Sequence, residues 1–440
     1  MALLDIPSRR AGDDLLVVPP ERGSTSGLVM RVLFLGLNYA PEEIGIAAYS
    51  TGMCEEFARR GHDVTAIVGK PYYPEWSVHP EFRGGGVRRS VENGVTLARV
   101  PHYVPAKPTG FKRIVHHFSF ALCSLVPTIH AALRERPDIV MTVGPSIIAA
   151  PVARIAARIS GAKSWLHIQD FEVDAAFATG LVASEGLPAR FAHGFERWVL
   201  GGFDRVSSIS YEMCKKAVQL GVAEDRVLQF RNWAEVETVT PLEKPSSFRD
   251  RWRIDTPHVA LYAGNIALKQ GIDILVETAR LLFYRKDLTF VVCGNGPNQK
   301  VLRECAAGLS NILFFDLQPK EQLSELMGLA TIHLLPQKAS AADLVLPSKL
   351  TNMLASGRPV VATAHSGTGL AREVEGSGVV VPPGDAKAIA AAIEYLIDSN
   401  ESHAKYSVAA RESALASWNK SKILENVERE MLALVAQEAY

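Results

Sequence analysis

Short apolar runs alternate with longer amphipathic stretches along most of the chain. Residues 31–36 have the pattern of a buried parallel strand, and a helix is predicted from about Gly45 to Arg60. Further strands are predicted over residues 63–68, 138–143, 164–168 and 205–210, with a helix over residues 147–160. Strands and helices that alternate in this way predict a doubly wound parallel sheet.

The alternation pauses and then restarts. Residues 236–257 contain Pro241, Pro245 and a serine pair, and are expected to form a linker. Strands are predicted again over residues 258–263, 288–293, 312–315, 331–335, 359–363 and 378–381. We therefore expect an α/β protein of two doubly wound domains, residues 30–235 and 258–401, that face one another across a cleft. Residues 1–29 are expected to be a flexible tail, and the helical pattern of residues 402–440 to pack back across the first domain.

Composition narrows the function classes. The chain has 440 residues, more than one ordinary domain, and its 47 Lys and Arg balance 47 Asp and Glu, which argues against a nucleic-acid partner. Five scattered cysteines favour reduced thiols in a cytoplasmic protein over a disulfide or metal framework. No stretch resembles a secretory signal. The longest apolar stretch, residues 114–133, is interrupted by polar residues. We therefore expect it to lie on a bilayer or in a core rather than to span a membrane.

Glycines mark three predicted turns from strand to helix. They lie at Gly45, at residues 264–271 and at residues 294–296. Glycine permits close backbone approach, and unpaired N–H groups at a helix start attract phosphate, although such a turn also needs glycine simply to turn. Three such turns at one inferred cleft favour phosphate binding. None of them is a dinucleotide fingerprint or a P-loop, which disfavours nicotinamide and ATP chemistry.

Residues 346–362, LPSKLTNMLASGRPVVA, are the most informative segment. The segment resembles the P-S-K-x-x-(E/N)-x-L-A-x-G-x-P-V region of GT-B-fold, family-four glycosyltransferases. Residues 37–61, 167–174, 232–233 and the Gly264 loop are similar to the colanic acid biosynthesis branch, so that the resemblance covers nearly all of residues 30–400. It implies transfer of a sugar from a nucleotide diphosphate donor, bound by the second domain, to a lipid-diphosphate-linked glycan held by the first. It also implies stereochemical retention and a role in exopolysaccharide biosynthesis.

The resemblance assigns roles to residues of the second domain. Lys349 would face the donor diphosphate and Asn352 would bind the ribose hydroxyls, whereas Lys349 could also be a solvated surface lysine. The candidate donor-binding residues are Gly45, Gly264, Asn265, Lys269, Gln270, Gly294, Gly296, Ser348, Lys349 and Asn352. The chain departs from the family pattern because the first of two usual glutamates falls on Leu344, with Asp343 adjacent. Asn265 and Gln270 likewise replace the commoner Arg and Lys, and Lys269 could supply the missing charge.

Residues 167–174, HIQDFEVD, end a predicted strand with one histidine and three carboxylates. By resemblance, His167 would contact the donor sugar, while Asp170 or Glu172 would orient the acceptor hydroxyl. The histidine could equally be structural, and the acids could cap the next helix. The candidate catalytic residues are thus His167, Asp170 and Asp343. No D-x-D follows a strand and the histidines lack ligand spacing, so we expect no metal and no other cofactor, with cationic side chains stabilising the leaving diphosphate.

Basic and aromatic residues precede the long apolar stretch. Lys107, Lys112 and Arg113 lie near Phe111 and are predicted to bind anionic lipid headgroups. A core helix with a solvated basic end is the alternative. With the implied lipid-linked acceptor, this predicts peripheral contact with the cytoplasmic face of the inner membrane. Two other functions stay open on the sequence: a sugar-nucleotide epimerase of the same fold, and a non-catalytic binding subunit.

Overall fold

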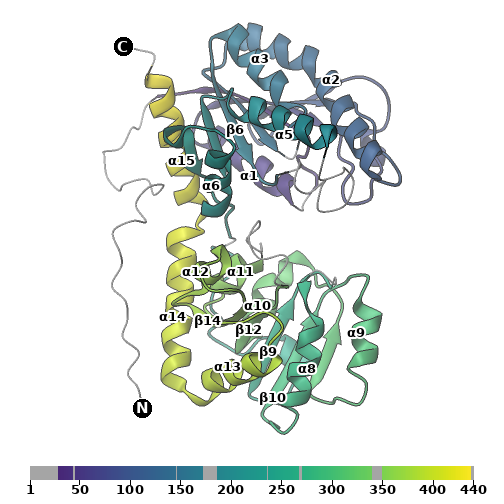
Figure 1. Ribbon diagram of the computed structural model, residues 1–440, viewed down its shortest axis with the longest axis vertical. Coiled ribbons are helices and arrows are strands. Elements are labelled where there is room, and N and C mark those ends of the chain that lie inside the picture. The colour runs from purple at the N-terminus through teal and green to yellow at the C-terminus, as the bar shows by residue number, and fades with distance from the viewer. Residues whose placement is uncertain are drawn as a thin grey trace. The chain divides into compact units, whose positions relative to one another are not determined.

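The computed structural model describes residues 28–42, 45–144, 146–171, 186–234, 236–266, 270–338 and 349–437. The chain divides into two compact units (Figure 1). The first holds residues up to Arg231 together with the chain from Leu424 onward, and the second holds Asn232–Ile423. Both are α/β units built on largely parallel sheets, as the sequence pattern predicts.

The first unit contains an eight-stranded sheet in the order β3-β4-β2-β1-β5-β6-β7-β8. Its strands are β1 (Arg31–Gly36), β2 (Asp63–Gly69), β3 (Arg88–Glu92), β4 (Val95–Val100), β5 (Ile139–Gly144), β6 (Lys163–Ile168), β7 (Arg205–Ser208) and β8 (Val227–Gln229). Every pair of neighbouring strands is parallel except β3 and β4. Asn93 and Gly94 join these two with φ values of 48° and 83°. Two positive φ angles are what a tight two-residue hairpin requires, so this antiparallel edge is encoded locally, although the alternation of strands and helices does not predict it.

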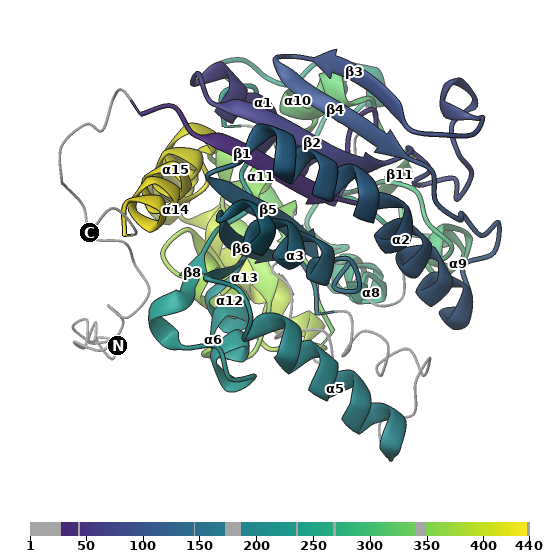
Figure 2. The same cartoon turned by 90° about the horizontal axis from the view of Figure 1, so that it is seen from above.

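One face of this sheet is covered by α2 (Gly110–Glu135), α3 (Ala150–Ser160), α5 (Leu187–Leu200) and α6 (Tyr211–Gln219) (Figure 2). Small residues let α3 approach the sheet closely: Ala150, Ala153, Ala156 and Ala157 are all buried at helical spacing. The remaining long helices of the unit are α1 (Ile46–Arg59) and most of α15 (Lys420–Ala436).

The C-terminal helical region consists of two helices that belong to different units. α14 (Asn400–Ser417) lies in the second unit, and Trp418 interrupts the helix where its carbonyl accepts a hydrogen bond from Ala234 N (2.9 Å). In the first unit, Glu428 of α15 accepts a hydrogen bond from Arg60 Nη1 (2.6 Å) and lies 2.9 Å from His62 Nε2. These partners fix α15 near the end of α1.

The second unit contains a six-stranded, fully parallel sheet in the order β11-β10-β9-β12-β13-β14. Its strands are β9 (His258–Ala263), β10 (Leu288–Cys293), β11 (Ile312–Phe315), β12 (Ile332–Leu335), β13 (Val360–Thr363) and β14 (Gly378–Val381). Its helices, besides α14, are α7 (Phe248–Trp252), α8 (Asp273–Leu281), α9 (Gln299–Cys305), α10 (Leu323–Gly328), α11 (Lys349–Ala355), α12 (Gly369–Val374) and α13 (Ala386–Asp398).

The predicted linker, residues 236–257, is part of the second unit. Val236, Val239, Phe248 and Ile254 are buried in the core of that unit, and the segment includes α7. The prolines and serines of this stretch therefore shape loops of a packed domain rather than a free connection, because these four apolar residues find partners in the core.

Candidate functional site

The order of strands in the second unit reverses between β9 and β12. The chain runs from β9 outward to β10 and β11, and then returns to place β12 on the other side of β9. In open parallel sheets, ligands bind at the carboxyl ends of the strands at such a reversal. The segments that follow β9, β10 and β12 include Gly264, Gly294 and Lys349, so these three sequence-predicted donor residues lie at this edge, whereas Gly45 belongs to the first unit.

Glycines allow two loops to pack against each other at this edge. Gly264 N donates to the carbonyl of Cys293 (2.9 Å), and Gly294 adopts a φ of 150°. A Cβ on Gly294 would overlap the carbonyl of Gly264, and a Cβ on Gly296 would overlap that of Ile266. The side chain of Lys349 occupies the space where a Cβ on Gly264 would lie. These three glycines therefore bring the backbone and the lysine together.

Lys349 is held by a short chain of hydrogen bonds. Its ammonium donates to Tyr262 Oη (2.7 Å) and to Gln270 Oε1 (3.4 Å). Tyr262 is fully buried near the end of β9, and its hydroxyl donates to the carbonyl of Asn265 (2.7 Å). Burial raises the pKa of Tyr262, so the hydroxyl stays protonated and can both accept from the lysine and donate to the loop.

Asn352 lies one turn after Lys349 on α11. Its amide oxygen is buried and has no hydrogen-bond partner among the residues that the structure describes. A buried acceptor without a donor is costly, and a ligand hydroxyl would satisfy it. Asn265, by contrast, already accepts a hydrogen bond from Leu317 N through its side-chain oxygen (3.2 Å). Its side chain therefore ties two loops together.

Four residues given roles from the sequence, Glu172, Lys269, Asp343 and Ser348, lie outside the described residues. Their roles stay predictions.

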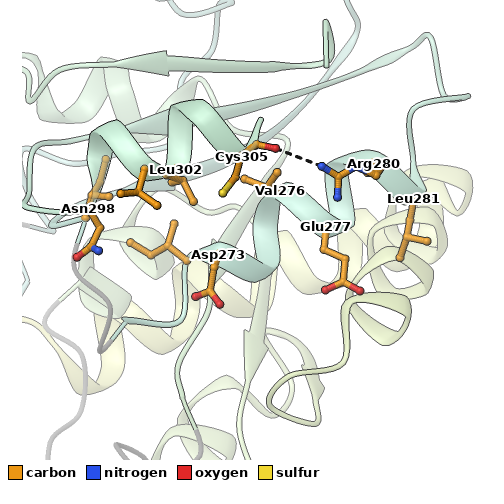
Figure 3. A pocket seen from close by; sticks show the side chains of 11 residues that line it. Asp273, Val276, Glu277, Arg280, Leu281, Asn298, Leu302 and Cys305 are labelled. Atoms are coloured by element: carbon orange, nitrogen blue, oxygen red, sulfur yellow. Dashed lines mark hydrogen bonds between the residues drawn. The ribbon is translucent and has the colours of Figure 1, made fainter. Parts of the chain in front are cut away.

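A groove of about 570 Å³ lies between α8 and α9 in the second unit (Figure 3). Its lining is mostly apolar and includes the carboxylates of Asp273 and Glu277. Its arginine, Arg280, already donates to the carbonyl of Cys305 (3.2 Å). Two carboxylates would repel a diphosphate, and the one arginine already has a hydrogen-bond partner, so this groove is not our candidate site.

In the first unit, His167 lies at the end of β6 and is buried. Its Nδ1 lies 3.0 Å from Ser207 Oγ and its Nε2 lies 3.0 Å from the Gln169 amide nitrogen. With the amide donating to Nε2, the ring proton resides on Nδ1 and points to Ser207. Burial lowers the pKa of His167 to about 3, so the imidazole is neutral at physiological pH. Both ring nitrogens have protein partners, and contact with a sugar would require Gln169 to give way.

Asp170 and Gly45 lie at the same carboxyl edge of the first sheet, and both are exposed. Gly45 begins α1 with a φ of 65°. Three residues before Gly45, Glu42 is a buried acid that no sequence motif marks as part of a site. Its buried carboxylate accepts from the backbone N–H groups of Tyr72 (2.7 Å) and Tyr73 (2.9 Å), and desolvation raises its pKa. The buried acid was not recognisable from the sequence because the two backbone N–H groups that bind it lie about thirty residues away in the chain.

α2 has the length and composition of a membrane-crossing helix, yet its buried residues pack on the first sheet. Lys107 precedes it, and Lys112 and Arg113 lie in its first turn, all three exposed. The Arg113 guanidinium lies 5.9 Å from the centre of the Trp76 ring. The predicted basic cluster is thus on the surface, at one end of α2.

Comparison with known proteins identifies the chain. Residues 45–233 match the Glycosyl transferase 4-like domain, and residues 245–413 match Glycosyl transferases group 1. A putative colanic acid biosynthesis glycosyl transferase of Escherichia coli K12, WcaI, is 38% identical over 405 residues, which cover 90% of this chain and 98% of that protein. The chain belongs to the family-four glycosyltransferases of the GT-B fold. The family resemblance drawn from residues 346–362 is therefore confirmed.

Solved structures agree with this glycosyltransferase in fold. Sucrose-phosphate synthase of Thermosynechococcus elongatus has a TM-score of 0.69 and 16% identity, with 92% of this chain and all of that chain covered. Anabaena HepE in complex with UDP has a TM-score of 0.68 and 14% identity over the same shares. Together with WcaI, the family matches support glycosyl transfer in polysaccharide biosynthesis as the activity of this glycosyltransferase.

Proposed function

We propose that the enzyme transfers a sugar, with retention, from a nucleoside diphosphate donor to a glycan carried on a lipid diphosphate. The donor part of this proposal rests on two residues of the same helix, Lys349 and Asn352. A cationic head and a buried amide oxygen, to which no described residue donates a hydrogen bond, lie on one short helix at the edge where the strand order reverses. A diphosphate and a ribose present the anion and the hydroxyl donor that such a pair would bind.

In the proposed reaction, the bond between the anomeric carbon and the diphosphate oxygen breaks, and an acceptor hydroxyl oxygen bonds to that carbon. The hydroxyl proton passes to the leaving diphosphate. The ammonium of Lys349 stabilises the negative charge that develops on the leaving diphosphate, and no metal ion takes part. Tyr262 and Gln270 hold the ammonium in place before the donor arrives, which reduces the ordering needed on binding.

The relatives support a nucleotide donor and a polysaccharide product. HepE was crystallised with UDP, and also with UDP-glucose in a second structure that has a TM-score of 0.62 to this chain. The name of WcaI places that protein in colanic acid biosynthesis. These properties support the proposed class of donor and the proposed class of pathway.

The acceptor part rests on one face of the first unit, which we call the apolar face. Phe111 is 77% exposed and Val126 74% exposed, and Phe118 and Leu122 lie between them on the same side of α2. The neighbouring helices α3 and α5 add exposed Ile155, Ile159, Leu187, Phe191 and Trp198. Exposed apolar side chains of this number, next to Lys107, Lys112 and Arg113, fit the surface of an anionic membrane. We accordingly place the enzyme at the cytoplasmic face of the inner membrane.

Transfer is tested by incubating the enzyme with a panel of nucleotide sugars, with and without a lipid-diphosphate-linked acceptor. We expect nucleotide release that depends on acceptor, and a product whose anomeric configuration, read by NMR, matches the donor. Lys349→Ala should lower turnover at least a hundredfold, whereas Lys387→Ala on exposed α13 should not. Epimerisation of the donor without acceptor would support the sugar-nucleotide epimerase instead, and no turnover by the wild type would support the non-catalytic binding subunit. Unchanged transfer by Lys349→Ala would refute the role of this lysine.

Membrane contact is tested separately by co-sedimentation with phosphatidylglycerol vesicles. The double variant Phe111→Ser/Phe118→Ser should bind several-fold less than wild type. Its control, Leu317→Ser/Val408→Ser, removes equally exposed apolar side chains from the second unit and should bind normally. If both variants bind the vesicles equally well, α2 does not contact the membrane.

A further inference from the structure

A hollow of about 280 Å³ lies between the second half of α2 and the β3-β4-β2 edge of the first sheet. Its polar lining consists of Thr65, Arg89, Thr96, His130, Arg134 and Glu135. Thr65 is the third residue of β2 and Thr96 the second residue of β4, so the hollow is near the amino ends of these strands. The candidate site residues Gly45, His167 and Asp170 instead follow the carboxyl ends. The hollow is therefore separate from the proposed site of transfer.

Strand register explains the polar floor. Thr65 pairs with Thr96, and Arg89 pairs with Ala98. Paired residues share a face of the sheet, and residues two apart along a strand do as well. Ile67 and Ala98, two positions after the threonines, belong to the core beneath α2. The two threonine hydroxyls and Arg89 therefore point toward α2. A sheet face that is covered by a helix usually carries apolar residues at such positions.

The opposite wall comes from α2. His130 and Arg134 are four residues apart and share one face of the helix, and Glu135 follows. Pro127 and Ala131 form the apolar part of this wall. One arginine thus reaches the hollow from β3 and the other from α2.

The charged side chains that line the hollow are available to bind a ligand. Among the described residues, no hydrogen bond or ion pair engages the side chain of Arg89, His130, Arg134 or Glu135. By contrast, the neighbouring Arg88 donates to the carbonyl of Glu81 (2.7 Å), and Arg99 pairs with Glu92 (2.6 Å). Guanidinium groups without a carboxylate partner are well suited to bind phosphate or carboxylate in a bidentate manner.

We propose that this hollow is a binding site for a small anionic sugar, a sugar phosphate or a uronate, apart from the transfer site. Arg89 and Arg134 take the phosphate or carboxylate, and Thr65, Thr96 and Glu135 hydrogen-bond the sugar hydroxyls. Pro127 and Ala131 contact the C–H face of the ring. The volume is close to the lower limit of small-molecule pockets, about 300 Å³, which suits one monosaccharide. The inference does not depend on the proposed function.

The test is titration calorimetry of the full chain with glucose 1-phosphate, glucuronate, inorganic phosphate and glucose, in the presence of saturating UDP. We expect at least one of the two anionic sugars to bind, and glucose not to bind. Arg89→Ala/Arg134→Ala should weaken binding at least tenfold. The control Arg158→Ala/Lys387→Ala, which removes the same charge from exposed positions, should leave it unchanged. Lys349→Ala should also leave it unchanged, which separates this site from the donor site.

Two outcomes would overturn the inference. One is that neither anionic sugar binds, or that Arg89→Ala/Arg134→Ala binds them as well as wild type does. The other is that the double variant loses binding to phosphatidylglycerol vesicles while the soluble sugars have no effect, because the arginines would then serve lipid headgroups. Urea unfolding of the double variant checks that the loss is local, and these exposed arginines should change the unfolding free energy by less than about 0.5 kcal/mol.

Discussion

Tyr262→Phe removes a single oxygen atom that joins Lys349 to the loop after β9. The hydroxyl accepts from the lysine ammonium and donates to the Asn265 carbonyl, each at 2.7 Å. A hydrogen bond to a charged group contributes about 1.5–3 kcal/mol and one between neutral groups about 0.5–1.5 kcal/mol. Asn265 is exposed and Lys349 is half-buried, so that water can replace part of each bond. The low ends of both ranges then apply, and we expect the free energy of unfolding to fall by about 2 kcal/mol.

The same change should weaken nucleotide binding. Without the tyrosine oxygen, the lysine side chain loses its 2.7 Å hydrogen bond and keeps the longer one to Gln270, so more of its ordering must take place when the donor binds. Ordering one such side chain costs about 0.5–1.5 kcal/mol, which corresponds to a dissociation constant for UDP about twofold to tenfold higher. The phenyl ring keeps the core contacts of β9, so the effect should not extend to the fold as a whole.

Urea denaturation and UDP titration of Tyr262→Phe measure the two effects. Tyr395→Phe is the matched control, because that hydroxyl accepts from Ser402 (2.8 Å) on the exposed side of α13 and should contribute under about 0.5 kcal/mol. If Tyr262→Phe is as stable as this control and binds UDP like wild type, the hydrogen-bond chain does not position the lysine.

Three further predictions concern backbone strain and buried titratable groups. Gly294→Ala should lower the free energy of unfolding, measured by urea denaturation, by roughly 3 kcal/mol or more, because the new Cβ would overlap a carbonyl. The control Gly308→Ala, at a φ of 84° with open space around it, should lower it by only about 1–2 kcal/mol. Burial raises the pKa of Glu196 to about 7, above its value in the unfolded chain, so stability should fall as the pH rises from about 5 to 7, and Glu196→Gln should flatten that part of the denaturation profile. Since the pKa of His167 is held to about 3, the imidazole does not titrate between pH 5 and 8, and His167→Asn should lower turnover without removing a limb of the pH–rate profile over that range.

Much of the fold was predictable because its signals are local. The period of apolar residues predicts eleven of the strands, including all six of the second sheet, and the glycines at 45, 264 and 294 predict turns that do require a positive φ. Residues 346–362 likewise predict a strand and a helix start with a lysine, and from these the family. In each case the information lies within one short stretch of chain.

The sequence by itself thus determined the α/β architecture, the family and the donor-side candidates Lys349 and Asn352. Tertiary structure decided which partners these residues meet: Tyr262 and Lys349 are 87 positions apart, and only the neighbouring positions of β9 and β12 bring them together. It also decided that, of the helical stretch predicted to pack on the first domain, only the chain from Leu424 onward belongs to the first unit, and that Arg89 and Arg134 line one hollow. Periodicity reports which face of an element is buried, whereas contacts between distant residues depend on strand order, register and packing, which no local pattern encodes.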